Sequence, residues 1–281
     1  MRQLSRQLLQ VIVYPNLFMV ICAVLMTQQT IGLFGLRLSH VALIPFIASA
    51  TLCSYSLHWY LTPAQASSSP RIDWNARNHR LMFGLFSLGL LGCMLFIIPL
   101  LGHLRPIAVA VVAATLYTAP KIRLRPLAWL SRVHVAKTLF LAFTWMYVTT
   151  LLPVLVDEAR PDTPKLLFCA SRLLLIYAIC VLFDHRDRDE DRRQGIRSLP
   201  TLMNDEQVRL LFLTTLVGFL ICTLCLYAIF PFRIILALAL PGLCAALLFQ
   251  RAMRKPSDML FYFVLDGLMV LSPLLTLFLM I

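Results

Sequence analysis

The sequence has little charge, and its few acidic residues are outnumbered by basic ones. Only 14% of the 281 residues are charged, whereas 60% are hydrophobic and the mean hydropathy is +0.81. A soluble globular protein averages about 25% charged and about 45–50% apolar residues. The composition therefore excludes an ordinary water-soluble enzyme, a disordered tail and a fibrous protein. It indicates a protein that crosses a membrane several times.

The sequence also lacks the pattern of a disulfide framework and that of a cleavable leader. All eight cysteines lie within apolar runs, where cysteine behaves as a small hydrophobic residue. Cys222 and Cys225 have C-x-x-C spacing, but no histidine or carboxylate is near them, so we expect no metal there. The first apolar run is too long for a secretory signal and has no small-residue cleavage site.

What the chain does have is a series of apolar runs, each near the roughly 20 residues that a membrane-spanning helix needs. The runs cover residues 11–35, 41–61, 81–102, 104–120, 135–156, 165–183, 208–230, 232–250 and 259–281. Because backbone polar groups must be satisfied within lipid, these runs should be helices. We therefore predict an all-α membrane protein with nine transmembrane helices, forming one polytopic domain over residues 1–281.

The distribution of basic residues predicts the orientation. With the N-terminus in the cytoplasm, 19 of the 25 Lys and Arg residues fall on the inner side. The six on the outer side are Arg37, Arg105, Arg160, Lys165, Arg172 and Arg233. The positive-inside rule favours this orientation and places the C-terminus outside. It also explains the net charge of +12 without a nucleic-acid partner. We expect a multi-pass protein of a bacterial plasma membrane, with the lipid bilayer as its surroundings.

Three predicted inner loops, 62–80, 118–134 and 184–207, are longer than hairpins require, and the third holds seven of the 13 acidic residues. If the helix over 165–183 continues into this loop, Asp187 and Asp191 lie near 300° and 340° relative to Asp184. These three carboxylates then share an arc of ~60° on one face of the helix.

Three carboxylates on one face repel one another unless a cation neutralises them. An all-oxygen ligand set favours a hard ion such as Mg²⁺, so we expect Asp184, Asp187 and Asp191 to be metal ligands and catalytic residues. Neighbouring arginines, including Arg188, could bind a phosphate. The alternative is a solvated, mixed-charge loop at a helix end, which is the usual role of a charge run.

The same segment, D-x-x-D-x-x-x-D-x-x-x-G-x-x-S-L-P from Asp184 to Pro200, resembles the second aspartate motif of the UbiA superfamily of intramembrane prenyltransferases. Tyr117-Thr-Ala-Pro-Lys121 resembles the family's Tyr-x-x-x-Lys element, and Tyr14-Pro15-Asn16 resembles its Pro-Asn segment in the first helix. The resemblance implies a nine-helix bundle around a central cavity, with aspartate motifs on the cytoplasmic side. It also implies diphosphate binding near Lys121.

The chain departs from the family at the first aspartate motif, N-D-x-x-D-x-x-x-D, which follows the second helix. Here the corresponding stretch is Ser54-Tyr-Ser-Leu-His-Trp-Tyr60, which contains no carboxylate, and the nearest acid is Asp73. His58 falls near the place of one missing aspartate, but imidazole is a poor ligand for Mg²⁺. Asn75 and Asn78 are further candidates for supplying oxygen atoms or hydrogen bonds.

Other polar residues in apolar surroundings have two interpretations each. Lys121 and Arg123 could bind a diphosphate together with Tyr117, or anchor the chain at the membrane surface. Asp266 lies within the last apolar run, where a carboxylate is costly and suggests a functional site. Asp266 and Asn16 could equally form a hydrogen bond that joins two helices.

Together these observations predict a membrane prenyltransferase that moves a prenyl group from a prenyl diphosphate to an unidentified acceptor with the help of Mg²⁺. One alternative is a UbiA-like terpene cyclase, which uses the same ionisation without an acceptor. A second is a non-catalytic relative that binds an isoprenoid, as the missing first motif would suggest. A small transporter is the least favoured, because the chain shows no clear repeat.

Overall fold

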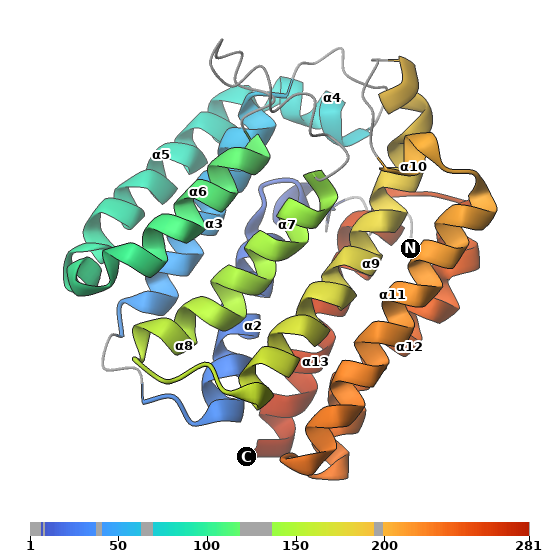
Figure 1. Cartoon of the computed structure of the whole chain (residues 1–281). Helices are drawn as coiled ribbons and strands as arrows, with labels where there is room; N and C mark the ends of the chain where they lie inside the picture. Colours follow the sequence, from blue (N-terminus) through green and yellow to red (C-terminus); the bar gives the residue numbers. More distant parts are fainter. Residues whose placement is uncertain are drawn as a thin grey trace.

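The computed structural model describes residue 7 and residues 9–37, 41–62, 70–118, 137–193 and 199–280, and these residues form helices and turns without a β-strand. Figure 1 shows the long helices running side by side. The elements are η1 (Leu9–Val13), α2 (Leu17–Phe34), α3 (Leu43–Tyr60), α4 (Pro70–Arg77), α5 (His79–Phe96), η2 (Ile98–His103), α6 (Leu104–Thr118), α7 (Lys137–Met146), η6 (Tyr147–Leu151), α8 (Leu152–Val156), α9 (Thr163–Arg193), α10 (Leu199–Leu202), α11 (Asp205–Cys225), η7 (Leu226–Ala228), α12 (Phe232–Arg254), η8 (Leu260–Leu265) and α13 (Asp266–Met280). The prediction of an all-α membrane protein is confirmed.

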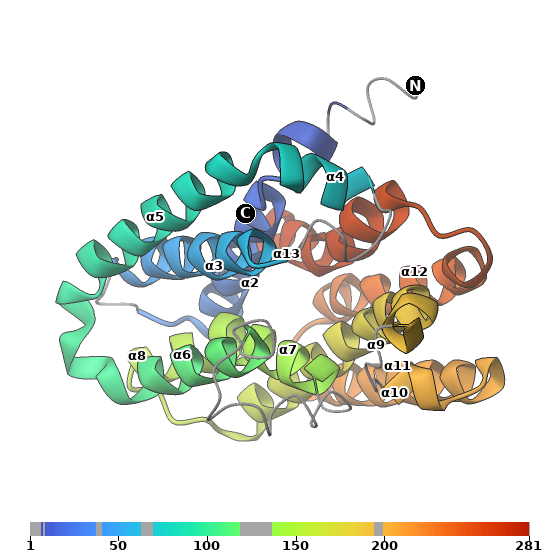
Figure 2. The same ribbon diagram turned by 90° about the horizontal axis from the view of Figure 1, so that it is seen from above.

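Seen along their axes, the long helices form an elongated ring (Figure 2). Around this ring α5 contacts α3, α3 contacts α2, α2 contacts α13, and α13 contacts α12. On the other side α12 contacts α11, α11 contacts α9, α9 contacts α7, and α7 contacts α6. The η2 turn joins α5 to α6 and so closes the ring.

Eight helical segments in the described part of the chain are long and apolar enough to cross a membrane. The ninth predicted span corresponds to α3, which is 18 residues long and packs along α5 but is not among the eight. Its second half carries Ser54, Ser56 and His58, and these polar side chains lower its mean hydropathy. With α3 included, the ring formed by the described residues has the nine long helices that the sequence predicted. α3 differs from the other eight in being more polar.

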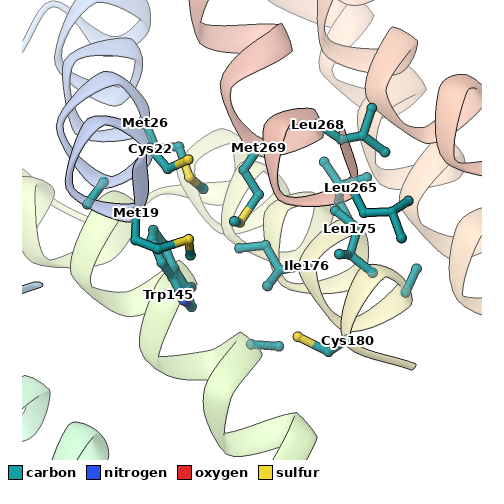
Figure 3. Packing of buried hydrophobic residues seen from close by; sticks show 14 of the residues in the cluster. Met19, Cys22, Met26, Trp145, Leu175, Ile176, Cys180, Leu265, Leu268 and Met269 are labelled. Carbon is teal, nitrogen blue, oxygen red and sulfur yellow. The ribbon is translucent and has the colours of Figure 1, made fainter. Parts of the chain in front are cut away.

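The interior of the ring is lined with apolar and sulfur-containing side chains. Figure 3 shows Met19, Met26, Trp145, Ile176 and Met269 pointing toward one another from α2, α7, α9 and α13. A small pocket of about 20 Å³ lies among these helices, with Met26 and Met269 in its wall. The predicted central cavity thus corresponds to an apolar interior that the side chains largely fill.

The helix formed by α7, η6 and α8 is interrupted by a π-helical turn that ends just before a proline. Pro153 has no N–H group, so it cannot donate to the carbonyl oxygen of Thr149 four positions before it. That oxygen instead accepts hydrogen bonds from Thr30 Oγ1 at 2.8 Å and from the Arg172 guanidinium at 3.4 Å. A local backbone defect therefore creates an acceptor for polar groups of two other helices.

The structure corrects the sequence-based position of Arg172, which the charge count placed on the outer surface. Arg172 lies on α9, is only 6% exposed and donates hydrogen bonds to the Met26 carbonyl oxygen and to Thr150 Oγ1. The count failed because hydropathy locates a span without showing which of its side chains face the interior.

Two of the predicted inner loops contain helices. Within 62–80 the chain forms α4 and begins α5, and within 184–207 it continues α9 to Arg193 and then forms α10. Most of the remaining predicted loop, 118–134, lies outside the described residues. Figure 1 places α4 and α10 at the same end of the bundle as the end of α9. We call this the aspartate end.

Candidate active site

The α9 helix runs without interruption from Thr163 to Arg193, so it carries the predicted aspartates as a direct continuation of a membrane-spanning segment. This confirms the assumption on which their spacing was interpreted. Positions 184, 187 and 191 therefore share one stripe of the helix, because i, i+3 and i+7 are neighbours on a helical surface. Asp189 lies outside this stripe and is exposed.

The first aspartate of the stripe is held by a neighbouring helix. Thr138, on α7, donates a hydrogen bond from its hydroxyl group to Asp184 Oδ2. Thr138 is only 6% exposed, and Asp184 is partly buried. The contact fixes the orientation of a carboxylate at the boundary between the apolar interior and the aspartate end. Sequence reasoning missed Thr138 because it lies 46 positions from its partner.

The second aspartate is paired with its neighbour in sequence. Asp187 accepts two hydrogen bonds from the Arg186 guanidinium, at 2.7 Å from Nε and 3.1 Å from a terminal nitrogen. Arg186 also donates to the Tyr262 hydroxyl group at 3.0 Å and lies over the Phe261 and Tyr262 rings. The end of α9 is thereby attached to η8, and the Asp187 carboxylate is neutralised by a guanidinium.

The chemistry of the stripe suits a hard divalent cation, because its three ligands would all be carboxylate oxygens. In the described part of the chain, however, no three histidine, cysteine or acidic side chains are close enough together to hold an ion. Asp184 is bonded to Thr138 and Asp187 to Arg186. The described side chains therefore form no ion site as they stand, and Asp187 would have to leave Arg186 to join one.

Arg188, predicted as a phosphate ligand, is paired with another helix. Its guanidinium donates to Asp205 Oδ1 at 2.6 Å, and His185 Nε2 lies 3.3 Å from the same oxygen. Asp205 is at the start of α11, where a carboxylate also stabilises the helix dipole. These contacts tie α9 to α11. The buried Nε of Arg188 has no hydrogen-bond partner among the described residues.

Asn16 occupies a break between η1 and α2 and lies at the centre of a buried polar group. Its backbone has φ 66°, a left-handed conformation that asparagine tolerates better than most residues. Its side chain donates to Ser56 Oγ at 3.4 Å, and its Oδ1 accepts a 2.9 Å hydrogen bond from Arg71. The sequence identified Asn16 as a candidate but gave no indication of Arg71.

The residue before this break, Tyr14, connects the start of α2 to the segment that precedes η8. Its hydroxyl group donates to Asp258 Oδ2 at 2.9 Å. Burial raises the pKa of Tyr14 above its usual value, and the nearby negative charge of Asp258 raises it further. The phenol therefore stays protonated and acts as a hydrogen-bond donor.

One of the candidates around the missing first motif attaches α4 to the bundle. Asn75 donates from its side chain to the Trp59 carbonyl oxygen of α3 at 2.6 Å. Asn78 donates to the Trp74 carbonyl oxygen at 2.8 Å, which is a bond back to α4 itself. His58 lies in the last turn of α3, with its ring edge-on to its neighbour Trp59. Of these contacts, the Asn75 bond is the one that helps to place α4.

Asp266 begins α13 directly after the π-helical turn η8, and it is 9% exposed. Its carboxylate makes no hydrogen bond to another described residue, while its backbone carbonyl lies 3.9 Å from Cys22 Sγ. The predicted hydrogen bond to Asn16 is absent among the described residues, since the Asn16 oxygen accepts from Arg71 instead. Tyr117 lies in the last turn of α6, and its side chain, Lys121 and Arg123 fall outside the described residues.

Comparison with known proteins supports one family. The model of the UbiA prenyltransferase family matches residues 73–263, which is more than half of the chain. No curated protein and no solved structure matches. The matched region contains the aspartate stripe and the Thr138 contact, and it ends within η8. With a helical membrane bundle and a matching family model, the chain belongs to the UbiA prenyltransferase family.

Proposed function

We propose that the protein is a membrane prenyltransferase that moves a prenyl group from a prenyl diphosphate to an acceptor carbon with the help of Mg²⁺. The observation that supports this proposal is the position of the aspartate stripe, which continues a membrane-spanning helix directly from the apolar interior. A substrate with a charged head and an apolar tail fits that boundary.

Asp184, Asp187 and Asp191 are the residues that would hold the ion, and Thr138 keeps Asp184 oriented toward it. Bound Mg²⁺ supplies positive charge that stabilises the diphosphate leaving group. Lys121, Arg123, Arg188 and Tyr117 are proposed to contact the same diphosphate, as the resemblance implies. Arg188 would then exchange its bond to Asp205 for a phosphate oxygen.

The reaction begins with cleavage of the allylic C–O bond, whose electron pair stays on the diphosphate oxygen. The acceptor carbon then attacks the resulting cation, and a carboxylate or the diphosphate takes the released proton. The apolar walls formed by Met19, Met26 and Trp145 exclude water that would otherwise quench the cation. We further propose that the aspartate end faces the cytoplasm of a bacterial cell, as the basic residues suggest.

Turnover of labelled prenyl diphosphates by the purified full-length protein with Mg²⁺ and candidate aromatic acceptors tests this proposal. We expect Asp184→Asn and Asp187→Asn to lower turnover by about a hundredfold or more, since each removes charge from the proposed ion site. Asp189→Asn, on the same helix but outside the stripe, is the matched control and should leave turnover unchanged. Equal turnover in all three variants would contradict the assignment of the stripe.

One alternative is supported by a specific observation. The stretch Ser54–Tyr60 contains no carboxylate, and two aspartates of the second motif are engaged by Thr138 and Arg186. A non-catalytic relative would bind a prenyl diphosphate without releasing diphosphate. Measuring binding and diphosphate release on the same samples separates this possibility from a transferase.

The same assay tests the cyclase alternative. Product formed from a prenyl diphosphate without any acceptor would identify a cyclase.

A further inference from the structure

A guanidinium group is buried beside the place where the family's first aspartate motif would lie. Arg71, in the first turn of α4, is only 4% exposed. Its guanidinium carbon lies 4.0 Å from the ring centroid of Trp59 and 4.3 Å from that of Tyr262. Trp59 belongs to the very stretch of α3 that carries no carboxylate. A fixed positive charge therefore occupies a region where the family has negative ligands.

The hydrogen-bond capacity of Arg71 is mostly unused. One terminal nitrogen donates to Asn16 Oδ1 at 2.9 Å, but the buried Nε has no acceptor among the described residues. Within the same residues, no carboxylate forms a salt bridge with it. An arginine can donate five N–H groups, and a buried one normally uses them. The N–H groups of Arg71 that make no hydrogen bond can donate to an acceptor from outside the described residues.

The charge around Arg71 is also unbalanced. Burial lowers the pKa of Arg71, whereas Tyr262 and the more distant carboxylates Asp266 and Asp258 act in the opposite direction. Arg186 lies 4.8 Å from the centroid of the same Tyr262 ring, but its charge is matched by Asp187. Arg71 is therefore the cation of this pair that forms no salt bridge with a described carboxylate, although Asp266 and Asp258 act on it electrostatically. An anionic group binding beside it would remove the imbalance.

We propose that Arg71 binds the diphosphate of the substrate from the side of the missing first motif, so that a guanidinium provides charge that the family obtains from an ion. This inference rests on the proposed function. Guanidinium remains charged throughout the physiological pH range and matches phosphate oxygens with two parallel N–H donors. The rings of Trp59 and Tyr262, which meet edge to face, both contact the guanidinium and hold it in place. Diphosphate binding by this chain should then not depend entirely on a divalent ion.

The test is the binding of inorganic pyrophosphate to the purified full-length protein in detergent with EDTA, measured by calorimetry. The wild-type protein should bind, and Arg71→Met should weaken binding by about tenfold or more, as expected for the loss of charge-assisted hydrogen bonds. Arg71→Lys should bind with intermediate affinity, because it keeps the charge and loses the paired donors. Arg77→Met, which changes an exposed arginine of the same helix, is the matched control and should bind like wild type.

A second variant tests the inference if removal of Arg71 disturbs folding. Asn16→Asp places a carboxylate where Arg71 already donates a hydrogen bond, so it neutralises the guanidinium without emptying the space around it. It should also weaken pyrophosphate binding in EDTA. The inference is overturned if wild-type protein does not bind pyrophosphate without a divalent ion, or if Arg71→Met and Asn16→Asp bind as tightly as wild type. Binding that depends on Arg71 in a protein without turnover would instead overturn the proposed transferase and keep the anion site.

Discussion

Arg172 on α9 donates a hydrogen bond from its guanidinium to the side-chain carbonyl oxygen of Gln29 on α2, inside the apolar bundle. The Gln29 amide in turn donates to Ser272 Oγ at 2.6 Å and to Thr276 Oγ1 at 3.0 Å, both on α13. Three helices that are distant in sequence are thus joined by one polar network. The acceptors of Arg172 among the described residues are all neutral, so hydrogen bonds rather than an ion pair offset the desolvation of its charge.

Replacing Arg172 should destabilise the fold. Arg172→Met leaves the Gln29 oxygen and the Thr149 carbonyl oxygen buried without this donor, so we expect a loss of about 3 kcal/mol in the free energy of unfolding. Thermal unfolding in detergent, followed by circular dichroism, measures the change. Arg233→Met, which alters an exposed arginine at the start of α12, should have little effect. Similar stability of the two variants would show that the network contributes nothing.

Removing the Thr138 hydroxyl group should impair catalysis more than folding. Thr138→Ala frees the Asp184 carboxylate to rotate, so we expect kcat/KM to fall by about tenfold and the Mg²⁺ concentration for half-maximal rate to rise. Thr138→Ser keeps the donor and should restore most of the activity. Thr144→Ala, on the same helix, loses only a bond to its own backbone and serves as the control. A loss in Thr138→Ala that serine does not restore would contradict a positioning role.

The contact between α3 and α5 depends on a glycine. A Cβ atom at Gly89 would lie 2.6 Å from the Cys53 backbone nitrogen and 2.8 Å from the Ser49 carbonyl oxygen, and backbone atoms cannot move aside cheaply. Gly89→Ala should therefore lower the free energy of unfolding by about 1–3 kcal/mol, as overpacking does. At Gly84 a Cβ would meet nothing within 4 Å, so Gly84→Ala is the matched control. Thermal unfolding of both variants distinguishes the two sites, and equal melting temperatures would refute the close contact.

The start of α9 should contribute a pH-dependent part of the stability. Lys165 donates to the Asp162 carboxylate from Nζ at 2.6 Å and from its backbone nitrogen at 3.2 Å, and these bonds hold the pKa of Asp162 below its usual value. A lowered folded-state pKa stabilises the fold above the unfolded pKa of about 3.9, and this contribution is lost as pH falls through the folded-state value.

The difference in melting temperature between wild type and Asp162→Asn should therefore be present near neutral pH and disappear in acid. It should be small, because the pair is exposed and screened by solvent. Lys165→Met should reduce the same difference. If the difference in melting temperature between wild type and Asp162→Asn persists unchanged below about pH 3, this ion pair is not its source.

The shared helical face of the three aspartates could be inferred from the sequence because it depends only on local spacing. Once α9 is a continuous helix, the spacing of Asp184, Asp187 and Asp191 alone places them on one face. It could not predict that Thr138 bonds to Asp184 or that Arg186 bonds to Tyr262, because those partners come from other helices. The engagement of two predicted ligands by other side chains is therefore a property of the packed bundle.

The sequence by itself determined the helical membrane architecture, since runs of about 20 apolar residues can satisfy their backbone in lipid only as helices. Tertiary structure alone decided the surroundings of the two buried arginines. In the sequence, Arg71 lies within a predicted loop and Arg172 within an apolar run, and neither position shows what surrounds the side chain. One is stacked between Trp59 and Tyr262, and the other reaches the Thr149 carbonyl oxygen that Pro153 leaves available. The free energy of a buried charge depends on which groups from distant segments surround it, and no local pattern encodes that.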